Sequence, residues 1–190
     1  MSQITQINIS KELGTFLQGR PLGKKHYARL CELLSETPQG EVVILNFSKV
    51  KTATGSWINE CLVPLLKWSA DERTDLFPVL VNVETSWQDE LQMVAGWTHN
   101  CFLLSHENNL QKAELIGSLD VAQTATFQAV AHASEVTGAE LERNHSKESI
   151  KATAWNNRLK DLFQKRLIRR KKRGREQVYS PVIAEVLSNG

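Results

Sequence analysis

The stretch IKATAWNNRLKDLFQKRLIRRKKRGREQVYSP, residues 150–181, predicts an amphipathic helix that leads directly into a basic β-hairpin. In its first half, apolar side chains recur at steps of three and four residues, the spacing of one helix face. They are Trp155, Leu159, Leu162, Phe163 and Leu167. Gly174 suits the hairpin turn, because glycine adopts positive φ without steric cost. Residues 177–179 resume a strand, which Pro181 ends.

The other side of this helix carries polar side chains that can meet nucleic acid. Asparagine pairs bidentately with adenine, and lysine binds guanine or phosphate. The hairpin adds a run of cations. Together these form the candidate DNA-binding set: Thr153, Asn156, Asn157, Lys160, Arg169, Arg170, Lys171, Lys172, Arg173 and Arg175. A charged run is often only a solvated surface, but the order of helix, turn and strand around this one favours binding.

Two possible capping boxes precede the helix and predict two further helices. Asp120 pairs with Gln123 in the first, and Thr137 pairs with Glu140 in the second. The helix from 121 contains Val121, Phe127, Val130 and Ala131, and a short helix covers 138–143. Three helices and a hairpin thus occupy residues 120–190.

This C-terminal part resembles a winged helix-turn-helix domain. The resemblance is carried by ATAWNNRL at 152–159, by Leu162, by LIRR at 167–170, by Gly174-Arg175 and by Tyr179. It implies an α+β domain whose third helix enters the DNA major groove, while the wing contacts the backbone or the adjacent minor groove. Many winged-helix regulators have glycine just before the apolar pair that opens the wing. Here Arg166 takes that place.

Charge is distributed very unevenly along the chain. Residues 1–142 hold ten Lys and Arg against seventeen Asp and Glu, whereas residues 143–176 hold thirteen against three. The overall charge of +2 conceals this difference. Such asymmetry indicates a polyanionic partner for the basic part and argues against polyanion contact by the first part.

Residues 1–105 predict an α/β domain with a mainly parallel sheet. The run VVILNF at 42–47 is continuous and β-branched, as in a strand buried on both faces. Further strands are expected at 3–9, 77–83 and 101–104, with helices between them. Residues 20–23 are interpreted as a turn before the first helix. Ser56 is expected to cap the second helix, which contains Pro64, and the third is expected to run from Ser86 to Gly96.

The segment VVILNFSKVKTATGSWINECLVPLL, residues 42–66, resembles the centre of a STAS domain, the fold of anti-sigma factor antagonists. It is most similar to STAS-like domains of unassigned function. In the antagonists a regulatory Ser follows an Asp at a helix start. Those two places fall here on Thr54 and Gly55. The neighbouring Ser56 and Thr54 remain possible modification sites, although a role as helix cap alone explains Ser56 better.

Catalytic motifs are not evident. The glycines at 14–23 lack the lysine and hydroxyl pattern of a phosphate loop, and the five histidines lie far apart. Cys31, Cys61 and Cys101 fit neither a disulfide framework nor a zinc site, and suit a reducing cytoplasm. No apolar run has the length of a membrane span, and the N-terminus has no signal-peptide pattern. We therefore expect a cytoplasmic protein that is not an enzyme, with no cofactor, no metal and no membrane partner.

The sequence leads to two hypotheses of different class. In the first, a winged helix at 120–190 binds duplex DNA as a transcriptional regulator, and a STAS-like domain at 1–105 senses a partner protein or ligand. Residues 106–119 would connect them, with room for one short strand, and a homodimer would read two half-sites. In the second, the chain is a protein-interaction switch in an anti-sigma or kinase-type pathway, and the winged helix docks another protein.

Overall fold

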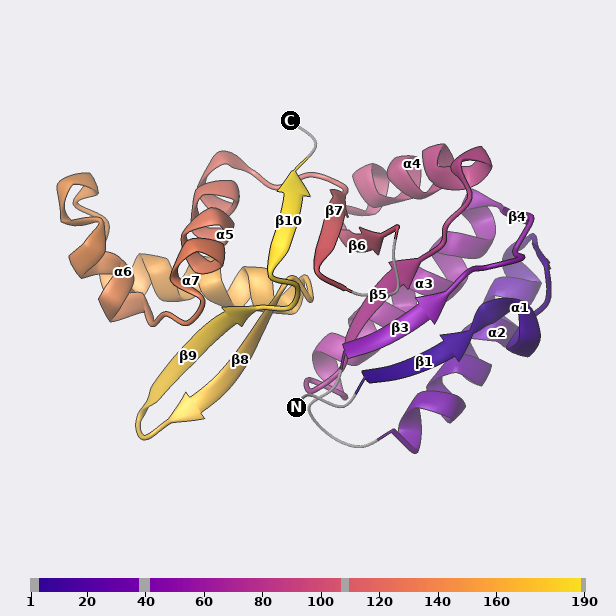
Figure 1. Ribbon diagram of the computed structural model, residues 1–190, viewed down its shortest axis with the longest axis horizontal. Coiled ribbons are helices and arrows are strands. Elements are labelled where there is room, and N and C mark those ends of the chain that lie inside the picture. The colour runs from indigo at the N-terminus through magenta and orange to yellow at the C-terminus, as the bar shows by residue number, and fades with distance from the viewer. Residues whose placement is uncertain (1–3, 38–41, 107–109, 189–190) are drawn as a thin grey trace.

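The computed structural model describes residues 4–37, 42–106 and 110–188, and it has a six-stranded sheet at its centre (Figure 1). Neighbouring strands are parallel except at β6–β7, which is antiparallel. The strand order is β1 (Ile4–Asn8), β3 (Val42–Asn46), β5 (Phe77–Val81), β6 (Phe102–Ser105), β7 (Lys112–Ile116) and β10 (Glu185–Ser188). The predicted α/β class with a mainly parallel sheet is confirmed.

One face of the sheet is covered by helices from the first half of the chain. Their apolar sides form a core with side chains such as Val43, Leu45 and Leu104. The helices are α2 (Arg20–Ser35), α3 (Gly55–Asp71) and α4 (Gln88–Thr98), with the small elements α1 (Ile9–Glu12), β2 (Phe16–Leu17), β4 (Thr52–Ala53) and η1 (Thr85–Trp87) beside them. The strands β3 and β5 are buried along their full length, because their alternate side chains enter two different cores.

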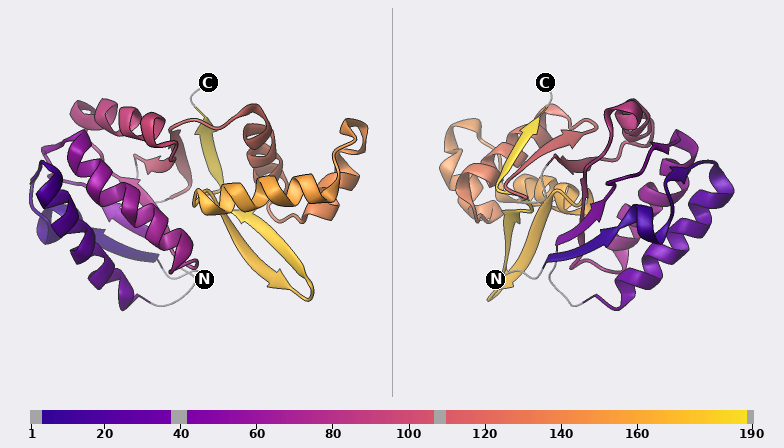
Figure 2. Two further views of the ribbon diagram at one scale, coloured as in Figure 1. Left: turned by 180° about the vertical axis from the view of Figure 1, so that it is seen from behind. Right: turned by 45° about the vertical axis from the view of Figure 1, so that its right-hand side comes forward.

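The C-terminal part packs on the other face of the same sheet. Val79 and Leu103 of the sheet share a second core with Trp155 and Phe163. The elements are α5 (Val121–Ala133), α6 (Gly138–Asn144), η2 (Ser146–Glu148), α7 (Ala152–Gln164), β8 (Ile168–Arg173) and β9 (Glu176–Pro181). Figures 1 and 2 show α5, α6, α7 and the hairpin on one side of the molecule and α1–α4 on the other. Both expected capping boxes are confirmed at the starts of α5 and α6.

Three local predictions are corrected. Thr54, not Ser56, caps α3, since its side chain accepts a hydrogen bond from the Trp57 N–H. The expected turn at 20–23 is the first turn of α2, where proline is well tolerated because the first helical N–H groups have no partner within the helix. Helix α4 continues past Gly96 to Thr98, where His99 with φ 55 forms a left-handed cap.

Two sheet strands were not placed by the sequence. β7 lies in the expected connector 106–119, which had room for one short strand. β10 brings the end of the chain back to the sheet, where it pairs in parallel with β7. The C-terminal part is therefore joined to the central sheet both by core packing and by backbone hydrogen bonding. The helices within the described ranges include none long and apolar enough to cross a membrane.

Candidate nucleic-acid interface

Helix α7 presents its polar side to solvent. Trp155, Leu159, Leu162 and Phe163 are buried, as the spacing predicted. Thr153, Asn156, Asn157 and Lys160 are all exposed. The start of α7 lacks a capping side chain of its own. Glu142 of α6 supplies one, since its carboxylate accepts from the Ala152 N–H at 3.0 Å.

A groove of about 410 Å³ lies between α7 and the hairpin β8–β9. Asn156, Asn157 and Lys160 line its helix side, and Arg170 and Arg175 line its hairpin side. The structure thus brings five members of the predicted set to one concave surface. The start of α6 forms a further wall, which the sequence did not indicate.

Gly138, the first residue of α6, allows that wall to approach α7. A Cβ at this position would lie 2.2 Å from the Asn156 Oδ1 and 3.1 Å from the carbonyl oxygen of Ala152. Any larger residue therefore has to displace the Asn156 amide or separate the helices. The absence of a side chain at 138 lets the Asn156 amide lie directly against α6 at the groove.

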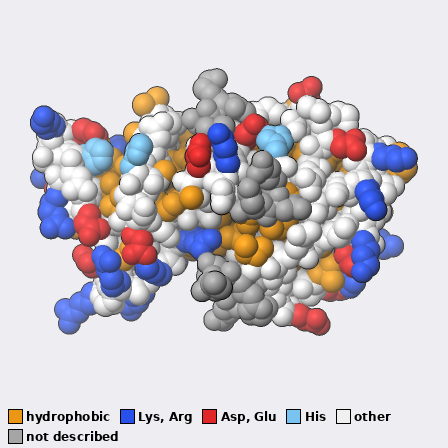
Figure 3. Space-filling model, in the orientation of Figure 1, with side chains coloured by type: hydrophobic (Ala, Val, Ile, Leu, Met, Phe, Trp, Pro, Cys, Tyr) orange, Lys and Arg blue, Asp and Glu red, His pale blue; other side chains and the backbone are white. Residues whose placement is uncertain are grey.

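Apart from Arg170, which lines the groove, the exposed cations of the hairpin fall into two groups. Lys171 forms an ion pair with Glu135, and Arg173 lies 3.9 Å from Glu135 and 3.8 Å from Glu140. Lys172 and Arg175 are exposed and have no ion pair within the part of the chain that the structure describes. Figure 3 shows Lys and Arg side chains gathered at the free end of the hairpin with acidic side chains beside them.

Glu140 is held in its ionised form by its surroundings. Hydrogen bonding by the Thr137 backbone N–H, at 2.7 Å, is the main cause that lowers the pKa of Glu140. The Thr137 hydroxyl and the charges of Arg173 and Arg143 act in the same direction, and burial opposes them. Glu140 is thus a persistent anion beside the hairpin, and it neutralises part of the hairpin charge.

Arg169 points away from the groove. Its Nη2 donates to the carbonyl oxygen of Val182 at 3.1 Å, and burial lowers the pKa of its guanidinium. Its Nε is buried without a partner in the described structure. Arg169 is thus a member of the predicted set whose guanidinium is hydrogen-bonded inside the protein, where it holds β8 to the segment after β9.

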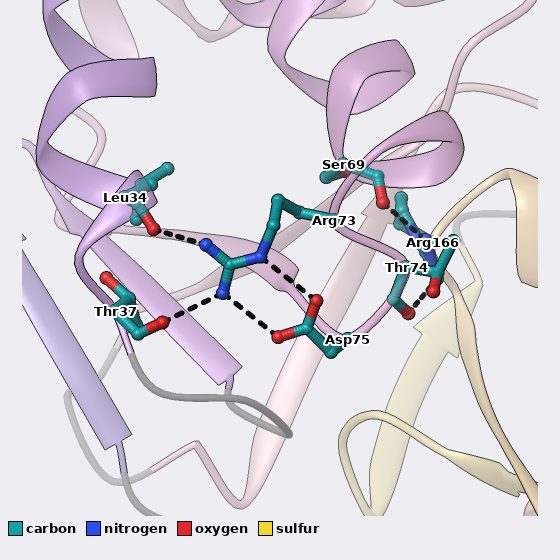
Figure 4. A network of polar contacts seen from close by, with 7 residues as sticks. All are labelled: Leu34, Thr37, Ser69, Arg73, Thr74, Asp75 and Arg166. Carbon is teal, nitrogen blue, oxygen red and sulfur yellow. Dashed lines mark hydrogen bonds and ion pairs between the residues drawn. The ribbon is translucent and has the colours of Figure 1, made fainter.

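Arg166, which was not among the predicted site residues, is the most buried cation in this region at 1 % exposure. It has φ 60, the left-handed conformation for which glycine is the usual residue. Its Nη1 donates to the Ser69 carbonyl oxygen at 2.8 Å, and its Nη2 donates to the Thr74 carbonyl oxygen at 3.3 Å (Figure 4). The only signal in the sequence was an arginine in the place where many winged-helix regulators, which this stretch resembles, have glycine.

Two aromatic rings complete the Arg166 environment. Its guanidinium carbon lies 4.4 Å from the Phe77 ring centre and 4.3 Å from that of Phe163. Arg170 also contacts Phe163, at 4.1 Å. Burial lowers the pKa of Arg166 to about 10, with a further contribution from the charge of Arg170, and Asp75 opposes both. At neutral pH Arg166 is still a cation.

The possible modification sites lie at the start of α3. Thr54 and Ser56 are half-buried, and their hydroxyl oxygens are 3.1 Å apart. The Gly55 N–H donates to the Glu90 carboxylate at 2.6 Å. A carboxylate therefore already interacts with this helix start, and a phosphate added nearby would be repelled by it. Modification of Thr54 or Ser56 stays a prediction.

Among the residues that the structure describes, no group of three or more His, Cys, Asp or Glu is placed to hold a metal ion. No family model, curated protein or solved structure matches this chain. The groove and the charges around it are therefore the features that bear on function.

Proposed function

We propose that this chain is a DNA-binding regulator in which a winged-helix module, residues 120–190, binds duplex DNA. One observation carries the proposal: the polar side of α7 and cations of the hairpin line the same groove. Three helices followed by a hairpin, with a bridge between Val136 and Tyr179 beside the hairpin, are the elements that such a module requires.

In this proposal α7 enters the major groove. Thr153, Asn156, Asn157 and Lys160 meet base edges and nearby phosphates, and the hairpin follows the adjacent backbone. The exposed Lys172 and Arg175 are the first candidates for phosphate contact. Lys171 and Arg173 reach phosphate by exchanging their carboxylate partners for it.

The N-terminal half, which resembles a STAS-like domain, would sense a partner protein or a ligand and bias DNA binding. It is suited to this role because its sheet carries the C-terminal module on its second face. A homodimer would let two such modules read two half-sites.

The proposal is tested by the salt dependence of binding to a fluorescent duplex of random sequence. Each phosphate contact contributes a slope of about −0.9 in a plot of log affinity against log salt. Lys172→Gln with Arg175→Gln is expected to reduce the slope by about 2. The matched control is Lys24→Gln with Lys25→Gln, which removes two exposed charges on α2. Absence of salt-dependent binding in the wild type, or equal slopes in both double variants, overturns the proposal.

A protein-docking role for the same module is favoured by a different observation. The hairpin cations Lys171 and Arg173 already bind carboxylates, those of Glu135 and Glu140. An acidic protein surface would supply the same groups. Capture from lysate before and after nuclease treatment separates the two roles: partners held through DNA are lost after nuclease, whereas an acidic protein partner is retained.

A further inference from the structure

The end of α3 and the turn that follows it, residues 69–75, are held by arginines from two sides (Figure 4). Within the turn, Arg73 donates to the carbonyl oxygens of Leu34 and Thr37, at 2.6 and 2.9 Å, and binds the carboxylate of Asp75. These contacts fix the turn to the end of α2. From the opposite direction Arg166 donates to the carbonyl oxygens at positions 69 and 74. We call residues 69–75 the junction turn.

A continuous set of contacts leads from the junction turn to the groove. Arg166 touches the ring of Phe77, at the start of β5, and the ring of Phe163 near the end of α7. Phe163 in turn contacts Arg170, which lines the groove. No residue of this set belongs to the exposed face of α7. The contacts therefore reach the groove from the protein core and not from the solvent side.

We infer that Arg166 is a positioning residue that sets Arg170 in the groove and makes its position depend on the junction turn. The inference rests on the proposed function and deepens it, because it names the route by which the N-terminal half regulates DNA binding. A partner or ligand that moves residues 69–75 shifts Arg166, and Arg170 moves with the Phe163 ring between them.

The chemistry of Arg166 suits this role better than simple packing. A buried guanidinium cannot slide freely, because loss of either carbonyl leaves a charged N–H without a partner. Its contacts with Phe77 and Phe163 add preferred geometry as well as attraction. Among the described residues no carboxylate binds it directly, so its position is set by the two carbonyl groups and the two rings. The contact is therefore directional, and it connects parts of the chain more than ninety positions apart.

A purely structural Arg166 would have a different signature. Its loss would lower stability without changing what Arg170 contributes to DNA binding. A positioning Arg166 makes the two residues interdependent, because residues that share a partner show coupling in double-mutant cycles. The distinguishing measurement is thus the effect of Arg170→Ala in different backgrounds.

The experiment measures affinity for a 20-base-pair duplex of random sequence at low salt, after thermal unfolding has shown each variant to be folded. Arg170→Ala is expected to weaken binding about tenfold in the wild type and only about twofold in Arg166→Gly, a coupling of about fivefold. Glycine keeps the left-handed conformation while removing the guanidinium. Phe77→Leu, which removes one of the two rings beside Arg166 and its edge contact with the Phe163 ring, is expected to reduce the Arg170 effect similarly.

Phe47→Leu is the matched control, since Phe47 is equally buried but belongs to the core on the other face of the sheet. It is expected to lower stability and leave the tenfold Arg170 effect intact. If Arg170→Ala costs the same factor in all four backgrounds, the inference is overturned. If Arg166→Gly does not fold, an unchanged Arg170 effect in Phe77→Leu still overturns the inference.

Failure of the proposed function has a separate readout. If the wild type shows no salt-dependent DNA binding, coupling is measured by amide hydrogen exchange in β8. Faster exchange at 168–173 in Phe77→Leu than in Phe47→Leu, at matched global stability, supports the connection between the junction turn and the hairpin. Equal exchange in the two variants refutes it.

Discussion

Gly138→Ala directly perturbs the contact between α6 and α7 that shapes the groove. The new Cβ would lie 2.2 Å from the Asn156 Oδ1, 2.7 Å from its Cγ and 3.1 Å from the Ala152 carbonyl oxygen. The amide can rotate away, but the backbone carbonyl cannot. Overpacking of this kind costs about 1–3 kcal/mol. We expect about 1 kcal/mol, at the low end of that range, because most of the overlap is with a rotatable side chain.

The assay is equilibrium urea unfolding of a double-mutant cycle with Asn156→Ala. Of the three atoms nearest to the new Cβ, removal of the amide leaves the Ala152 carbonyl oxygen at 3.1 Å, so Gly138→Ala is expected to cost under about 0.5 kcal/mol in that background. Gly96→Ala is the control: it lies exposed in α4 with nothing within 4 Å of a Cβ, and it should stabilise by about 0.5–1 kcal/mol. If Gly138→Ala lowers the free energy of unfolding equally in both backgrounds, or raises it as Gly96→Ala does, then Gly138 is not needed for the close contact between α6 and Asn156.

Because Thr54 is the α3 cap, Thr54→Ala should lower the free energy of unfolding in urea by about 1 kcal/mol. Ser56→Ala should change it by less than about 0.5 kcal/mol. A larger loss for Ser56→Ala than for Thr54→Ala would show that Ser56 is the cap. Burial and then the charge of Lys25 lower the pKa of His26 from 6.5, so the fold favours neutral His26. The contribution of neutral His26 to the free energy of unfolding is therefore complete above pH 6.5 and is lost as the pH drops through the lowered pKa. In His26→Gln the free energy of unfolding should change less between pH 7.5 and pH 5. Gly23→Ala should lower the midpoint of urea unfolding, because a Cβ at position 23 would lie 2.8 Å from the Glu60 Cβ on α3. The expected loss in the free energy of unfolding is about 1–3 kcal/mol. Unchanged stability would contradict the tight contact between α2 and α3.

Much of the sheet was predictable because its strands lie between two cores. A strand covered on both faces has few places for polar residues, so runs such as VVILNF can be recognised as strands from the sequence alone. β10 escaped prediction because it is four residues long and pairs with a distant strand. Pairing of that kind depends on tertiary contacts that leave no local periodicity. The start of α3 was misassigned by two residues because Thr54 and Ser56 are both good caps, and only the fold selects between them.

The exposed face of α7 was also predictable from burial. The apolar residues that enter the core recur at helical spacing, and the residues between them must lie on the exposed side. The partners of the cations were not. Arg166, between α7 and β8, and Arg169, on β8, bind carbonyl oxygens of residues elsewhere in the chain, and no local pattern encodes those carbonyls. In the sequence, Gly138 was only the first residue after the cap Thr137, although its missing side chain is what lets α6 form a wall of the groove.

These assignments change the electrostatics expected of the interface. Four cations of the predicted set are exposed without an ion pair in the described residues, which predicts a salt slope of about −3.6: Lys160, Arg170, Lys172 and Arg175. Full engagement of Lys171 and Arg173 as well would take the slope to about −5.4, because their bonds to Glu135 and Glu140 must be exchanged for phosphate. Glu135→Gln with Glu140→Gln removes that competition and should raise affinity at low salt. A slope much steeper than about −5.4 in the wild type would mean that Arg169 turns outward on binding, away from the carbonyl oxygen of Val182 that it binds here.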